Sequence, residues 1–113
     1  MAKYDARLDT LFSALGDPTR RAVIARLARG EATASELAAP HAMSLPSFLA
    51  HLRRLEEAGL IATAKQGRTR VCRLTPDALG PAQDWLVEQR AAWTGRLDRF
   101  DAYVTALAKD RDA

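Results

Sequence analysis

Residues 44–74 read SLPSFLAHLRRLEEAGLIATAKQGRTRVCRL, and this stretch carries most of the information about the fold. Ser44 can cap a helix over residues 44–58, and Gly59 stands where a left-handed residue ends such a helix. Two short runs of β-forming residues follow and flank Gly67, which is typical of a β-hairpin. The order of helix, strand, turn and strand predicts a recognition helix followed by a wing.

The same stretch concentrates the positive charge of the chain. Its formal charge is +4, whereas the whole chain carries +3, residues 1–43 carry +1 and residues 75–113 carry −2. The charged residues of the stretch are Arg53, Arg54, Lys65, Arg68, Arg70 and Arg73, against Glu56 and Glu57. A basic segment of this kind indicates a polyanionic partner such as DNA.

Upstream of this stretch, local signals predict three more helices. Apolar residues at helical spacing indicate a helix over 5–15. Asp17 as N-cap, with proline next, opens a helix over 18–29. A Thr-x-x-Glu capping box begins a short helix at residue 33, and Pro40 must end it. Two helices across a short turn predict a helix-turn-helix over 33–58 with a wing at 60–75.

A last helix is predicted from Pro81 to residue 109. Apolar residues recur there seven apart, with a second offset row, which gives a stripe of 3.5-residue period. The stripe consists of Leu86, Trp93, Phe100 and Leu107 with the offset residues Leu97 and Val104. In a chain of 113 residues, such a stripe favours a dimer interface over a monomer surface.

The chain as a whole fits one domain over 1–113, mainly α with a small β-hairpin wing. The charged start MAKYDARLDT predicts no signal peptide, and no run approaches the ~20 apolar residues of a membrane span. We therefore expect a cytoplasmic protein without membrane association. The lone Cys72 excludes a disulfide within the chain.

The predicted DNA contacts come from the helix and the hairpin. On a helical wheel, Phe48, Leu49, Leu52 and Leu55 form a buried stripe. The opposite row contains Ser47, His51 and Arg54, which can reach base edges or phosphates in a major groove. Lys65, Arg68 and Arg70 on the hairpin can bind phosphates or a minor groove. The structural alternatives are a solvated helix face and charges that protect a sheet edge from aggregation.

Taken together, these segments resemble the ArsR-type winged-helix repressors, in particular a subgroup without metal-binding cysteines. The resemblance rests on FSALGDPTRRAVIARL at 12–27, SELA at 35–38, MSLPSFLAHLRRLEEAGLI at 43–61, GRTRVCRL at 67–74 and the tryptophan-bearing last helix. It implies a homodimer that represses transcription from a pseudo-palindromic operator in double-stranded DNA until an effector, here unknown, arrives. The helices 5–15 and 81–109 then form the dimer interface, through Leu8, Leu11, Phe12, Leu86, Trp93, Leu97, Phe100 and Val104.

The recognition helix departs from the family pattern, which has a Ser-Gln start and a Ser-Lys/Arg-His triplet. This chain has Leu45, Leu49 and Ala50 at the polar positions, so only Ser44, Ser47 and His51 carry over. Packing is the favoured role for Leu45, and contact with a thymine methyl group is the alternative.

The residues present do not suit metal sensing or catalysis. Residues 33–40 contain no cysteine and residues 81–113 no histidine, so neither a thiolate nor a zinc site is expected. No catalytic triad, phosphate loop or carboxylate pair stands out, so we expect neither an enzyme nor a cofactor.

Two alternative functions remain open. The recognition helix, which lacks several of the family's polar side chains, could bind a partner protein instead of DNA. Alternatively, the protein could bind DNA and also act as a sensor. An apolar effector could bind between the aromatic residues of the terminal helix, Trp85, Trp93, Phe100 and Tyr103. Oxidation of Cys72 could instead be the signal, if Arg70 and Arg73 lowered the pKa of its thiol.

Overall fold

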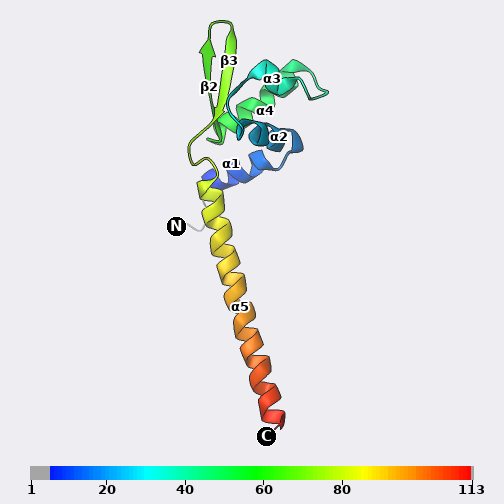
Figure 1. Ribbon diagram of the computed structural model, residues 1–113, viewed down its shortest axis with the longest axis vertical. Coiled ribbons are helices and arrows are strands. Elements are labelled where there is room, and N and C mark those ends of the chain that lie inside the picture. Colours follow the sequence, from blue (N-terminus) through cyan, green and yellow to red (C-terminus); the bar gives the residue numbers. More distant parts are fainter. Residues whose placement is uncertain (1–5, 113) are drawn as a thin grey trace. The chain divides into compact units, whose positions relative to one another are not determined.

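The computed structural model describes residues 6–112, which form five helices and three strands (Figure 1). In chain order they are α1 (Ala6–Leu15), α2 (Pro18–Leu27), β1 (Ala32–Thr33), α3 (Ala34–Ala38), α4 (Leu45–Glu57), β2 (Ile61–Gln66), β3 (Thr69–Leu74) and α5 (Gly80–Asp112). The predicted start of the first helix at Asp5 lies outside the described residues. The chain divides into two compact units, one ending at Gly80 and one beginning at Pro81.

Helix α2 begins as predicted and ends two residues early. The Asp17 carboxylate accepts a hydrogen bond from the backbone N–H of Arg20 at 3.0 Å, and Pro18 occupies the first turn. At the other end, the N–H groups of Arg29 and Gly30 bond to carbonyls three residues back. These bonds tighten the last turn out of α-helical geometry, so the helix ends at Leu27.

The helix-turn-helix consists of α3, a turn and α4. The predicted capping box is present, because the N–H of Glu36 donates to Thr33 Oγ1 at 3.1 Å and the N–H of Thr33 donates to Glu36 Oε1 at 2.8 Å. Ser44 caps α4 as predicted. Gly59, after the helix, has a φ of 75°, which a residue with a Cβ rarely adopts.

The sheet has three strands in the order β1-β3-β2, all antiparallel, although the sequence predicted only a two-stranded hairpin. The additional strand β1 pairs Ala32 with Cys72 and is two residues long. A strand this short shows no alternation in sequence, so the pattern could not reveal it. In the hairpin, Gln66 pairs with Thr69, so the connection is only two residues long, and its Gly67 has a φ of 63°.

The core of the first unit lies between α1, α2, α3, α4 and the sheet. Its apolar side chains are at most 4% exposed and include Leu11, Val23, Leu27, Leu37, Phe48, Leu52, Leu55, Leu60, Ile61 and Cys72. The prediction that Leu49 belongs to this buried set is wrong, because its side chain is 36% exposed. It lies at the edge of the apolar face of α4, where it lines an open groove with Thr63 of β2 and Arg70 of β3.

Helix α5 is continuous over 33 residues, a length of about 50 Å at the usual rise. Its stripe residues are exposed within the chain, from 45% for Val104 to 64% for Trp93. Over the described residues 6–112, no helix combines the length and the apolar character needed to cross a membrane.

Candidate nucleic-acid interface

The start of α4 uses two predicted DNA contacts for its own capping. Ser44 Oγ accepts a hydrogen bond from the N–H of Ser47 at 3.2 Å and donates to Ser47 Oγ at 2.9 Å. The hydroxyl group of Ser44 is therefore used, as donor and as acceptor, in capping the helix. Ser47 Oγ accepts in this pair, so its hydroxyl hydrogen remains available to an acceptor outside the protein.

His51 lies against α2, and the structure does not place it on the outermost face of α4. Its Nδ1 lies 3.0 Å from Arg20 Nη1 and 3.8 Å from Asp17 Oδ2, and its side chain is 22% exposed. A guanidinium only donates hydrogen bonds, so Nδ1 accepts and the hydrogen of the neutral imidazole is on Nε2. That Nε2–H is the group that His51 can offer to a phosphate or a base edge.

Arg20 also ties α1 to this cluster. Its Nε donates to the carbonyl of Ala14 at 2.7 Å and its Nη2 to the carbonyl of Ser13 at 3.2 Å. The neighbouring Arg21 donates to the carbonyl of Leu15 at 2.7 Å. The last carbonyls of α1 are therefore satisfied by side chains of α2. The sequence did not predict that Arg20 and Arg21 would bind these carbonyls. The signal for such a role is a pair of basic residues just inside the start of one helix, soon after another helix ends.

We expect Asp17→Ala to lower the free energy of unfolding by about 1 kcal/mol at neutral pH, the usual contribution of an N-cap. The hydrogen bond from the backbone N–H of Arg20 and, to a smaller extent, the charge of Arg20 hold the pKa of Asp17 below its ordinary value. The stabilisation is therefore complete above the ordinary aspartate pKa and is lost as the pH falls through the lowered one.

Urea denaturation of both proteins at neutral pH and at progressively lower pH measures this difference. The gap between Asp17→Ala and the parent should close in acid, whereas Asp98→Ala, a change of an exposed side chain within α5, should cost little at any pH. A gap that persists when Asp17 is protonated would show that the carboxylate charge is not what stabilises the helix end.

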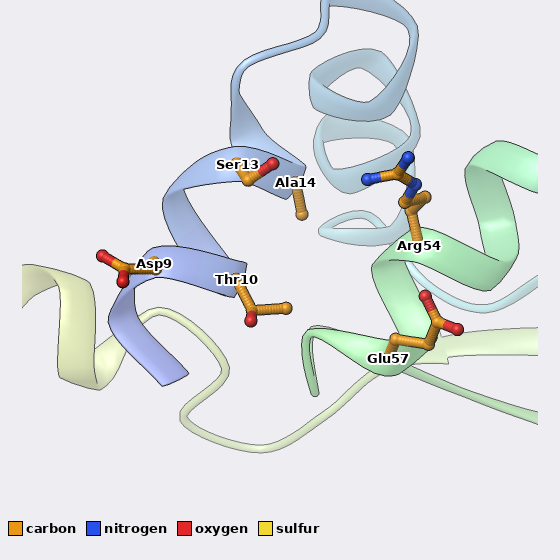
Figure 2. A pocket seen from close by; sticks show the side chains of 6 residues that line it. All are labelled: Asp9, Thr10, Ser13, Ala14, Arg54 and Glu57. Carbon is orange, nitrogen blue, oxygen red and sulfur yellow. The ribbon is translucent and has the colours of Figure 1, made fainter. Parts of the chain in front are cut away.

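Arg54, a predicted major-groove contact, lies on the α1 side of α4. Figure 2 shows Arg54 and Glu57 of α4 across an open hollow from the α1 residues Asp9, Thr10, Ser13 and Ala14. Its exposed neighbour Arg53 lies about 100° around the helix, where it lines a groove beside the strands. Arg53 was not among the predicted contacts, because a helical wheel of α4 does not show on which side of the helix the wing lies.

The wing carries two cations directly opposite each other. Lys65 of β2 pairs with Arg70 of β3, and alternation along the strands puts both on the same face as buried Cys72. Like charges in this position repel, and the nearby Glu56 carboxylate, joined to Arg70 through Thr63, offsets only part of this repulsion. Arg68 lies in the two-residue loop at the tip and is exposed.

Arg70 is held toward α4 by a short relay of hydrogen bonds. Its Nη1 donates to Thr63 Oγ1 at 2.8 Å, and Thr63 Oγ1 donates to Glu56 Oε2 at 3.2 Å. Arg70 therefore lies over the groove between α4 and the wing. This groove is lined by Leu49, Leu52, Arg53, Glu56, Thr63 and Arg70.

Apolar side chains are exposed just before α4 and along its first half, and one of them, Leu49, lines this groove. Leu45 is 56% exposed, and Leu49 and Met43 are each 36% exposed. The favoured role of Leu45 as a packing residue is therefore wrong. Because α4 rotates 100° per residue, Leu45, Leu49 and Arg53 follow one another at intervals of four along the same edge.

Cys72 is fully buried in β3, and burial raises the pKa of its thiol above the ordinary value. Nearby Arg70 lowers it by less. This opposes the low pKa on which a redox switch at Cys72 depended, since the thiolate is the reactive form. Among residues 6–112, no three His, Cys, Asp or Glu side chains are grouped so that they could hold a metal ion.

The predicted dimer residues fall into two groups. Those on α5 are all exposed by about half or more of their surface, apart from Val104 at 45%. On α1, Leu8 and Phe12 are partly exposed, whereas Leu11 is 4% exposed and belongs to the core of its own unit. The assignment of Leu11 to a surface between subunits is therefore corrected.

Comparisons with known proteins agree on one kind of molecule. Residues 15–64 match the family described as a helix-turn-helix domain. The chain is similar to the HTH-type transcriptional regulator Rv2034 of Mycobacterium tuberculosis, with 39% identity over 92 residues, or 81% of this chain and 76% of that protein. It is similar to the transcriptional repressor SdpR of Bacillus subtilis, with 30% identity over 71% of this chain and 89% of that protein.

Solved structures give the same result. The crystal structure of the ArsR family transcriptional regulator RHA00566 matches with a TM-score of 0.78 and 50% identity, covering 83% of this chain and 97% of that one. An ArsR-like transcriptional regulator from Rhodococcus sp. RHA1 matches with a TM-score of 0.71 and 32% identity, covering 84% and 90%. The similarity extends well beyond the helix-turn-helix segment.

Proposed function

Since the chain belongs to the ArsR family of winged helix-turn-helix transcriptional regulators and is a DNA-binding regulator of transcription, we propose that it acts as a homodimeric repressor of a pseudo-palindromic operator. In this arrangement α4 of each subunit lies in a major groove, and the two helices are about 34 Å apart, one turn of B-DNA. The exposed stripe of α5 supports the dimer, because an apolar surface of this length is otherwise left in water.

The observation that carries the DNA assignment is the exposed pair Lys65 and Arg70, of which Arg70 lies in the groove beside α4. Two cations directly opposite each other repel, Glu56 offsets only part of this, and a DNA phosphate relieves the rest. We assign phosphate or minor-groove contacts to Lys65, Arg68 and Arg70, and major-groove contacts to Ser47 and the Nε2–H of His51. In our proposal Ser44 acts by capping the helix, and Arg54 reaches the backbone from the α1 side.

The proposal also includes location and regulation. A regulator must share a compartment with its DNA, and the buried free thiol of Cys72 suits a reducing cytoplasm. We assign no enzymatic activity. Binding of an apolar effector among the α5 aromatics remains an alternative, and it predicts a ligand-dependent rise in thermal stability.

The wing assignment is tested by Lys65→Ala/Arg68→Ala. We expect weaker binding to every DNA sequence and a smaller dependence of affinity on salt, because each lost phosphate contact removes about 0.9 from the slope of log K against log salt concentration. The double variant should therefore lower the slope by nearly two. Fluorescence anisotropy titrations of operator and unrelated DNA at several salt concentrations measure both effects.

The matched control is Arg29→Ala/Arg99→Ala, which removes the same charge from two exposed positions, one just after the end of α2 and one on α5. It should change the slope little. If both double variants change the slope equally, net charge is responsible and the wing has no special role. If neither changes it, the wing assignment is wrong.

A further inference from the structure

We infer that Leu45 and Leu49 select the operator by contact with the 5-methyl groups of thymine in the major groove. This inference rests on the proposed function, because it requires α4 to lie in that groove. It assigns specificity to positions where the resembling repressors carry polar side chains.

The first support is that these leucines are not needed to build the domain. The core-facing side of α4 is filled by Phe48, Leu52 and Leu55, all at most 4% exposed. Leu45, by contrast, is 56% exposed in the first turn of the helix, and Leu49 follows one turn later at 36%. An apolar edge on the front half of a recognition helix costs solubility, so a binding role is its natural explanation.

The second support is the charge around this edge. Arg53 continues the edge one turn after Leu49, and Arg70 lies across the groove on β3. Glu56, the acidic residue of the groove, already accepts a hydrogen bond from Thr63. The groove therefore places two guanidinium groups close to the apolar side chain of Leu49, which suits a ligand that carries anionic groups near a small apolar one. In a DNA major groove, the thymine methyl is that apolar group, and the phosphates flank it.

The third support is the scarcity of polar groups that could read bases here. The hydroxyl of Ser44 is used in the cap, and Ser47 retains one hydrogen to donate. The other donor that the proposed function assigns to the major groove is the Nε2–H of His51. Adenine, guanine and thymine all present acceptors there, so these two donors discriminate weakly among them. Apolar contact is then the main source of discrimination on this edge.

The test uses deoxyuridine, which differs from thymidine only by the missing methyl group. An operator is first obtained by selecting bound genomic fragments, and each thymine of one half-site is then replaced in synthetic duplexes. Burial of one methyl group predicts a loss of about fourfold in affinity at each contacted position. Positions outside the footprint of α4 should show no loss.

The variant arm asks which residues sense the methyl group. At the position that its own leucine contacts, each of Leu45→Ala and Leu49→Ala should bind thymine and deoxyuridine duplexes equally, at about the affinity of the parent for deoxyuridine there. Each variant should keep the loss at the position that the other leucine contacts. Val87→Ala, which truncates an equally exposed apolar residue on α5, should keep the full discrimination. Urea denaturation of each variant checks that it folds.

The outcomes separate the inference from the proposed function. Sequence-specific binding with no loss at any deoxyuridine position overturns the inference and leaves the repressor proposal intact; this arm needs no variant. Failure to select any DNA overturns both. Discrimination that survives at every position in both Leu45→Ala and Leu49→Ala shows that other side chains read the methyl groups, which also overturns the assignment to these residues.

Discussion

Phe100→Asp should convert the proposed dimer into monomers and weaken operator binding by about 10²–10⁴-fold. Phe100 lies in the middle of the α5 stripe and is 62% exposed within its own chain. Burying a carboxylate there against a second apolar helix leaves the charge without a partner, which is strongly unfavourable. Separated subunits also lose the high effective concentration that a dimer gives to its second half-site, and this loss sets the size of the effect.

Two measurements are needed, because affinity alone does not report assembly. Sedimentation equilibrium gives the subunit association, and anisotropy titration on the operator gives the DNA affinity. Ala102→Asp is the matched control, because it places the same charge on the same helix away from the stripe. A Phe100→Asp protein that stays dimeric contradicts the interface, and so does an Ala102→Asp protein that dissociates equally.

Phe48→Ala should lower the free energy of unfolding by about 3–5 kcal/mol. Phe48 is 1% exposed, and its ring stacks on His41 with centroids 5.5 Å apart and an interplanar angle of 23°. Its loss leaves a cavity beneath the recognition helix and removes the contact that joins α4 to the preceding turn. Small domains are stable by only about 5–15 kcal/mol, so this one change consumes a large share of the total.

Urea denaturation followed by circular dichroism measures the loss, at one fixed protein concentration because dimer stability depends on it. Leu45→Ala serves as the control, since it truncates an exposed side chain of the same helix and should change stability by no more than about 0.5 kcal/mol. A loss below about 1 kcal/mol for Phe48→Ala would mean that the surrounding core closes over the cavity.

The sequence predicted those parts of the fold that depend on neighbouring residues. Caps at Asp17, Thr33 and Ser44 involve partners three residues away, so their signals are local and the structure confirms them. The apolar spacing of α4 likewise identified Phe48 and Leu55 as core residues. Strand β1 escaped prediction because its pairing with β3 joins residues about 40 positions apart.

The candidate site was harder to predict, for a related reason. A helical wheel shows which side of α4 is apolar but not which neighbours lie beside it. Leu49 was therefore assigned to the core, and His51 and Arg54 to the outermost row, although both lie toward α1 and α2. The contact of His51 with Arg20 joins residues 31 positions apart, and it requires the packing of α2 on α4.

One guanidinium, that of Arg20, joins three parts of the first unit: its own helix α2, the carbonyls of Ser13 and Ala14 at the end of α1, and the imidazole of His51 on α4. A shift in the last turn of α1 therefore changes, through Arg20, the hydrogen bonding of a recognition-helix side chain. Thermodynamic linkage makes this relation reciprocal, so whatever engages His51 also alters the free energy of the last turn of α1. The junction between the first two helices is therefore part of the support of the recognition helix as well as a structural joint.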